Sequence, residues 1–136
     1  MFLIASLYIN RFWKNILFEF NFSGVFDLAP ILKTSVNIPQ LGLSLDNVAT
    51  WSPLSDENVA RLSTRAAHVR FWIVVAENDS PAFKSQAKQY FEKLVANKFK
   101  VEMSEQKIED HFSLVEKLKD EEYTLTKAII KFMREL

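Results

Sequence analysis

Hydrophobic positions form three clear patterns in the second half of the chain. The run from His68 to Ala76 is β-branched and aromatic, which is typical of a strand buried on both faces of a parallel sheet. Ser80 and Pro81 have the residue types that begin a helix, and apolar residues then recur at helical spacing as far as Ala96. Val101 to Ile108 alternates in part and predicts a second strand.

Further elements are predicted on both sides of this region. Phe112 to Leu118 and Tyr123 to Leu136 are predicted helices, and the second carries its apolar residues on one face. Near the N-terminus, Phe2 to Asn10 is a predicted buried helix and Ile16 to Phe22 a predicted core strand. Strands that alternate with helices indicate an α/β fold with a parallel sheet and right-handed crossovers.

The segment between the first two predicted strands is patterned weakly. Ser23 to Leu28 leaves the first strand through a glycine turn, and Ala29 to Gln40 contains two prolines that predict a short helix or turn between loops. Leu41 to Asn47 shows no clear period. Trp51 to Leu54 is a predicted loop, because the residue before a proline avoids the α region.

Composition and charge limit the partners. The 136 residues carry 17 basic and 17 acidic side chains, a balance that does not suggest nucleic acid or an anionic membrane. No cysteine is present, which excludes disulfides and thiolate metal sites and fits a reducing compartment. The apolar run Met1 to Ile9 has no basic segment before it and falls short of the roughly 20 residues that span a bilayer, so we expect a cytoplasmic protein.

Two polar residues follow consecutive predicted strands. Asp79 comes after the strand that ends at Ala76, and His111 comes after the strand that ends near Ile108. Ligands of open parallel sheets bind at this carboxyl edge. An acid there can orient a histidine through one ring nitrogen, and the other nitrogen can then take a proton from a nucleophile. The chain order of acid and then histidine agrees with that of α/β-hydrolases.

Each of these residues also has a purely structural explanation. Asp79 precedes a helix, whose dipole stabilises a carboxylate, and His111 by itself fits a surface or capping position. Asp110 is the expected N-cap of the following helix and competes with Asp79 as the acid, although it is poorly placed to bond the adjacent ring. His68 is predicted to be exposed at the start of a strand. The residues alone leave these alternatives open.

Three motifs resemble those of the kynurenine formamidases (arylformamidases), which are α/β-hydrolases. Ser23 to Leu28 reads Ser-Gly-Val-Phe-Asp-Leu and is similar to the family's Ser-Gly-Val-Tyr-Asp-Leu. Asp79 to Phe83 resembles the acid loop Asp-Ser-Pro-Glu-Phe, and Asp110 to Phe112 resembles the histidine motif Asp-His-Phe. Further residues that fit the family pattern are Asn37, Ser52, Pro53, Ser85, Gln86, Val115, Glu116, Leu118, Leu125 and Thr126.

The resemblance implies that residues 1–136 form a single partial domain, the C-terminal half of an α/β-hydrolase fold. It assigns Asp79 as the acid and His111 as the histidine of a triad. The N-terminal strands, the His-Gly-Gly oxyanion motif and the Gly-x-Ser-x-Gly nucleophile elbow are missing, and the chain has only two glycines. Ser6, Ser23 and Ser80 lack an elbow context, so none is predicted to be the nucleophile. No metal or organic cofactor is implied.

The implied reaction is the hydrolysis of N-formyl-L-kynurenine to L-kynurenine and formate in tryptophan catabolism, with that small molecule as the substrate once the missing half completes the site. The chain by itself is expected to be an inactive fragment. Neither nucleic acid nor a membrane is expected as a partner. The open edge of an incomplete sheet can pair with another protein chain, and a homodimer is one possible outcome. The alternatives are another α/β-hydrolase, such as a carboxylesterase or a relative of acyl-peptide hydrolases, and a non-catalytic interaction module. A flavodoxin-like domain is disfavoured, because the chain has no glycine-rich phosphate loop.

Overall fold

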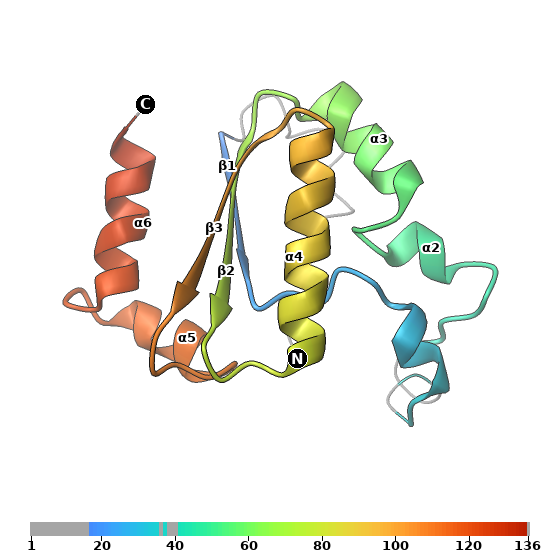
Figure 1. Ribbon diagram of the computed structural model, residues 1–136, viewed down its shortest axis with the longest axis horizontal. Helices are drawn as coiled ribbons and strands as arrows, with labels where there is room; N and C mark the ends of the chain where they lie inside the picture. Colours follow the sequence, from blue (N-terminus) through green and yellow to red (C-terminus); the bar gives the residue numbers. More distant parts are fainter. Residues whose placement is uncertain (1–16, 36, 38–40, 136) are drawn as a thin grey trace.

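A parallel sheet of three strands lies at the centre of the computed structural model, which describes residues 17–35, 37 and 41–135. The strands are β1 (Phe18–Phe22), β2 (Arg70–Ala76) and β3 (Lys100–Gln106), in the spatial order β1-β2-β3. Both neighbouring pairs are parallel, so all three carboxyl ends lie at one edge of the sheet (Figure 1). The predicted α/β class is confirmed. The predicted helix at Phe2–Asn10 lies outside the described residues.

Helices cover both faces of the sheet. Helix α4 (Pro81–Ala96) packs on one face and α6 (Thr124–Arg134) on the other (Figure 1). Helix α4 has the bounds that its sequence predicted, because Ser80 caps it and Pro81 is its first residue. The predicted helix at 112–118 is divided into one α-helical turn and a 3-10 turn. These short elements are α5 (Ser113–Glu116) and η3 (Lys117–Lys119), and a further 3-10 helix, η2, spans Ala29–Lys33.

Two helices of the connection between β1 and β2 were not predicted. These are α2 (Val48–Trp51) and α3 (Asp56–Arg65). The prediction of a loop from Trp51 was wrong for that residue, which ends α2; the chain leaves the helix at Ser52. Helix α3 begins at a good N-cap, where the Ser55 side chain accepts a hydrogen bond from the third helical residue. Few of its residues are apolar, so the hydrophobic pattern of the sequence did not predict it.

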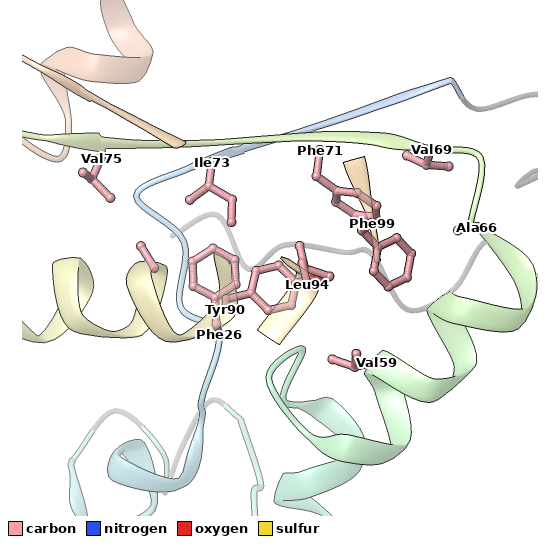
Figure 2. Close-up of a cluster of buried hydrophobic side chains, with 11 residues drawn as sticks. Phe26, Val59, Ala66, Val69, Phe71, Ile73, Val75, Tyr90, Leu94 and Phe99 are labelled. Atoms are coloured by element: carbon pink, nitrogen blue, oxygen red, sulfur yellow. The ribbon is translucent and has the colours of Figure 1, made fainter. Parts of the chain in front are cut away.

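The side chains of β2 divide between two apolar clusters. Phe71, Ile73 and Val75 face α4, where they pack with Tyr90 and Leu94 (Figure 2). The alternate residues of β2 face α6 and pack against a mainly aromatic layer from β1 and α6. That second cluster contains Trp72, Val74, Ala76, Leu114, Leu125 and Phe132, with Phe18, Phe20 and Phe22 beside it. Burial on both faces explains why β2 reads as a continuous apolar run.

The strand boundaries differ from the prediction where the chain turns. The predicted strand at Val101–Ile108 ends at Gln106, because Ile108 turns the chain with a φ of 70°. A positive φ is costly for a β-branched residue, and Ile108 is also 84% exposed. At the other end of the sequence, β1 pairs with β2 alone within the described residues, so one edge of the sheet has no described partner.

Candidate functional site

The predicted acid and histidine come together at the carboxyl edge of the sheet. Asp79 lies in the loop between β2 and α4, and His111 lies between β3 and α5. The distance from Asp79 Oδ1 to His111 Nδ1 is 3.3 Å. The Asp79 side chain is fully buried, whereas that of His111 is 40% exposed. A buried carboxyl group therefore faces one nitrogen of a ring that is open to solvent. Their catalytic roles remain a prediction.

The second oxygen of Asp79 is held by two donors. Asp79 Oδ2 accepts a hydrogen bond from the backbone N–H of Ala76 at 2.8 Å and another from the Ser23 hydroxyl. Ser23 directly follows β1 and is 3% exposed. Residues that follow all three strands thus meet at one carboxyl group.

Two aromatic side chains flank the His111 ring. The centroid of Phe83, from α4, lies 4.6 Å from that of His111, and the Phe112 ring meets it edge-on at 5.3 Å. Phe112 is 72% exposed. Among the described residues no group forms a hydrogen bond with Nε2 of His111. This nitrogen is free to exchange a proton with a reacting group once Nδ1 is held by the acid.

The loop of the acid and the loop of the histidine are joined directly. The Asn78 N–H donates to the Glu109 carbonyl at 2.9 Å, and the Glu77 carboxylate accepts the N–H of Ile108 at 2.8 Å. Lys107 Nζ lies 3.1 Å from the same carboxylate. The pKa of Glu77 is lowered, first by the Ile108 N–H and then by Lys107. These contacts fix the position of one loop relative to the other.

The competing acid, Asp110, has the capping role instead. Its Oδ1 accepts the backbone N–H groups of Phe112 and Ser113 at 2.9 and 2.8 Å, and these bonds lower its pKa. The neighbouring Glu109 is buried and accepts hydrogen bonds from Lys117 at 2.8 Å and from the Ser113 hydroxyl at 2.5 Å. Both acidic groups therefore stabilise the start of α5, directly after His111.

Two of the residues that fit the family pattern shape the segment after Ser23. Gln86 Oε1 accepts the N–H groups of Phe26 and Asp27, both at 2.9 Å, and its Nε2 donates to the Asp27 carbonyl at 3.1 Å. Ser52 Oγ accepts the N–H of Leu28 at 3.0 Å. These side chains do not touch the acid or the histidine. They act by holding the chain that carries Ser23.

Other candidate features lie apart from this pair. A cavity of about 420 Å³ beside α4 is lined in part by Asp27, Ser52 and Lys93, but neither Asp79 nor His111 contributes to it. In residues 17–35, 37 and 41–135, no cluster of three or more acidic or histidine side chains could hold a metal ion. The helices within those residues are also too short or too polar to cross a bilayer.

Two polar residues near the site were not predicted to take part in it. Ser23 was part of a family motif and was rejected as a nucleophile, and Glu77 was given no role. A signal for Ser23 was present, because it follows a strand at the same edge as Asp79. Glu77 had the same signal, because it directly follows β2, but its bond to the Ile108 N–H depends on the turn at Ile108.

Sequence and structure comparisons identify relatives of this chain. No protein-family model matches it. The kynurenine formamidase of Danio rerio is 37% identical over 111 residues, and that of Salmo salar is 35% identical over 112. Each alignment covers 82% of this chain but 37% of the relative, so the chain spans little more than a third of those enzymes.

A solved structure supports the same fold. It is that of a proposed thioesterase from Silicibacter sp. TM1040, and it matches with a TM-score of 0.69 at 24% identity. The match covers 87% of this chain and 40% of the other. The chain is thus homologous, over most of its own length, to part of the kynurenine formamidases, and its sheet and flanking helices form part of an α/β-hydrolase fold.

Proposed function

We propose that this chain supplies the acid and the histidine of a site that hydrolyses N-formyl-L-kynurenine to L-kynurenine and formate. Asp79 is the acid and His111 is the general base and acid. One observation carries the proposal: a fully buried Asp79 lies 3.3 Å from a partly exposed His111, in a chain that is 37% identical to a kynurenine formamidase. The substrate is a small molecule, and we propose that the reaction belongs to tryptophan catabolism in the cytoplasm.

The geometry suits acyl transfer through a covalent intermediate. With Nδ1–H of His111 donating to Asp79, Nε2 carries the lone pair that removes the proton from a nucleophilic hydroxyl. That oxygen attacks the formyl carbon, and His111 then gives the proton to the aromatic amine as the C–N bond breaks. A water molecule, activated by the same nitrogen, attacks the formyl ester and releases formate.

The nucleophile has to come from residues outside these 136. The sequence contains no Gly-x-Ser-x-Gly elbow and no His-Gly-Gly motif. Loss of a nucleophile removes most of the rate enhancement of a serine hydrolase, and loss of an oxyanion donor removes more. We therefore expect no formamidase activity from the 136-residue chain alone.

A chimera tests the proposal. The part of the Danio rerio enzyme upstream of the aligned region would be joined to this chain, so that the relative supplies the nucleophile and the oxyanion donors. We expect the chimera to release kynurenine from N-formyl-L-kynurenine, and His111→Ala to abolish that release. A chimera that is folded by circular dichroism and gel filtration, but that has no such activity, would contradict the proposal.

One observation favours a second class of function. The outer edge of β1 has no partner among the described residues, and an unpaired edge offers a row of backbone donors and acceptors. The chain could then act as an interaction module that pairs with another protein or with a second copy of itself. Gel filtration of the purified chain tests this second reading: a dimer or larger assembly would support pairing through the edge, and a stable monomer would argue against pairing with a second copy.

A further inference from the structure

We propose that Ser23 is a positioning residue for the acid: its hydroxyl holds the Asp79 carboxyl group in the orientation that presents Oδ1 to His111. This proposal rests on the proposed function for its catalytic consequence, but not for its geometry. Ser23 does not touch His111. It acts through Asp79, whose Oδ2 it bonds.

The surroundings of Ser23 leave its hydroxyl little freedom. The residue is 3% exposed, and its backbone N–H donates to the carbonyl of Val74 at 2.8 Å. It therefore continues the pairing of β1 with β2 by one bond beyond the strand. The hydroxyl is fixed in register with the loop that follows β2, where Asp79 lies.

The backbone at Ser23 has a strained conformation that a glycine at this position would adopt more easily. Ser23 has a φ of 43°, in the left-handed region that glycine tolerates best, whereas Gly24 does not have a positive φ. The turn thus places its unfavourable conformation on the serine and not on the adjacent glycine. Strain of this kind persists where the surrounding structure compensates for it, and Ser23 has two such contacts: its hydroxyl bonds Asp79 and its N–H bonds Val74.

The two oxygens of Asp79 have separate roles. Oδ2 takes the Ala76 N–H and the Ser23 hydroxyl, so the carboxyl plane is set by two donors from different loops. Oδ1 is left for His111, at a distance of 3.3 Å that is long for a hydrogen bond. Without the hydroxyl, the carboxyl group can turn about the single remaining donor, and a small rotation is enough to break this contact.

The first test measures the tautomer of His111. Long-range ¹H–¹⁵N NMR of the full 136-residue chain, at a pH where imidazole rings are neutral, separates Nδ1–H from Nε2–H, with His68 as a reference in the same spectrum. Ser23→Gly and Ser23→Ala both remove the hydroxyl. We expect each to lower the ratio of Nδ1–H to Nε2–H in His111 roughly fivefold, the factor that one ordinary hydrogen bond supplies. Ser63→Ala, in α3, is the control and should leave the ratio unchanged.

The two variants also separate positioning from stability. Glycine relaxes the positive φ and alanine does not, so Ser23→Gly should unfold at a higher urea concentration than Ser23→Ala. If Ser23 acts on His111 through Asp79, both variants shift the tautomer equally despite this difference. If the serine were only structural, the shift would follow stability, and the glycine variant would keep the original ratio. That second result overturns the proposal.

Kinetics of the chimera provide the second test. Ser23→Gly should lower kcat roughly tenfold and leave KM unchanged, because a misplaced base affects the chemical step and not substrate binding. An inactive parent chimera whose His111 tautomer still depends on Ser23 would contradict the proposed function and leave the positioning role standing. An unchanged tautomer ratio overturns the positioning role, whatever happens to the rate.

Discussion

Glu109 is buried in the loop after β3 and Glu19 is partly buried within strand β1, but the chain surrounds them differently. Glu109 accepts hydrogen bonds from Lys117 and Ser113, which lower its pKa. Burial raises the pKa of Glu19 to about 7. The loops at the carboxyl edge thus stabilise a charged carboxyl group, whereas the strand favours a neutral one.

The contrast extends to the other acidic groups of the edge. Asp110 and Glu77 accept backbone N–H groups that lower their pKa values, and Asp79 has two donors on a single oxygen. Donors that are fixed before a substrate arrives are what an electrostatically organised site requires. At Glu19, burial outweighs the one side-chain donor, Asn21, that lowers its pKa. The predictions that follow run from the largest expected effect to the smallest.

Replacing the acid should have the largest effect. In the chimera, Asp79→Asn keeps the shape of the side chain but presents an amide to the ring, and it should lower kcat roughly ten-thousandfold, as expected when a triad histidine is left in the wrong tautomer. Asp110→Asn is the matched control, since an asparagine Oδ1 can still accept the two N–H groups that begin α5. Steady-state kinetics would decide between them: a large loss from Asp110→Asn alone would make Asp110 the acid.

Glu19→Gln should change how stability depends on pH. Burial places the folded-state pKa of Glu19 at about 7, above its ordinary value of 4.5, so the stability contributed by the protonated group is complete below pH 4.5 and is lost as pH rises to 7. The loss amounts to at most about 3 kcal/mol, because the side chain keeps some exposed surface. Urea unfolding at a series of pH values should show this decline in the parent and not in Glu19→Gln.

The acidic groups of the edge should act in a separate pH window. Their pKa values are lowered, so their contribution is complete above the unfolded value and is lost as pH falls below about 4. In the same urea series, Glu109→Gln should therefore reduce the loss of unfolding free energy below about pH 4. The loss between pH 4.5 and 7 should stay unchanged. If Glu109→Gln instead removed the loss between pH 4.5 and 7, the proposed difference between the carboxyl edge and strand β1 would be wrong.

Gln86→Ala should have the next largest effect on stability. It leaves the N–H groups of Phe26 and Asp27 without their acceptor, and two partly buried donors that lose a partner cost roughly 2 kcal/mol or more. Gln89→Ala, on the same helix, removes an exposed amide that bonds only Ser85 in the described structure. Chemical unfolding of both variants measures the difference, and equal losses would show that the Gln86 contacts contribute nothing.

Local signals explain how much of the fold could be predicted. Strand β2 is buried on both faces, so its sequence is apolar throughout, and α4 carries its own start signal in Ser80 and Pro81. Helix α3 was missed although Ser55 offers a start signal, because only Val59 and Asn58 of its ten residues are buried and few of its positions are apolar. The prediction succeeded where the burial of an element leaves a clear hydrophobic pattern in its own sequence.

The site, too, has one part that the sequence predicted and one part that it did not. The meeting of Asp79 and His111 follows from a general rule about the carboxyl ends of neighbouring parallel strands, so two positions in the sequence were enough to predict it. The roles of Ser23 and Glu77 depend on a φ of 43° at Ser23, a φ of 70° at Ile108 and the contact between two loops. The contacts themselves are properties of the folded chain, although the place of each residue directly after a strand marked it as a candidate.

Glu102→Gln should have the smallest effect of the series. Its carboxylate lies 3.1 Å from Arg70 on the neighbouring strand, but the Glu102 side chain is 59% exposed and the pair is screened by solvent and salt. Arg70 also lies over the Phe132 ring, 4.1 Å from the centroid, a contact that does not involve Glu102. We expect a loss of about 0.5 kcal/mol or less by urea unfolding, falling further at high salt. A loss as large as that of Gln86→Ala would mean that burial is not what distinguishes the polar contacts of the carboxyl edge from those elsewhere on the sheet.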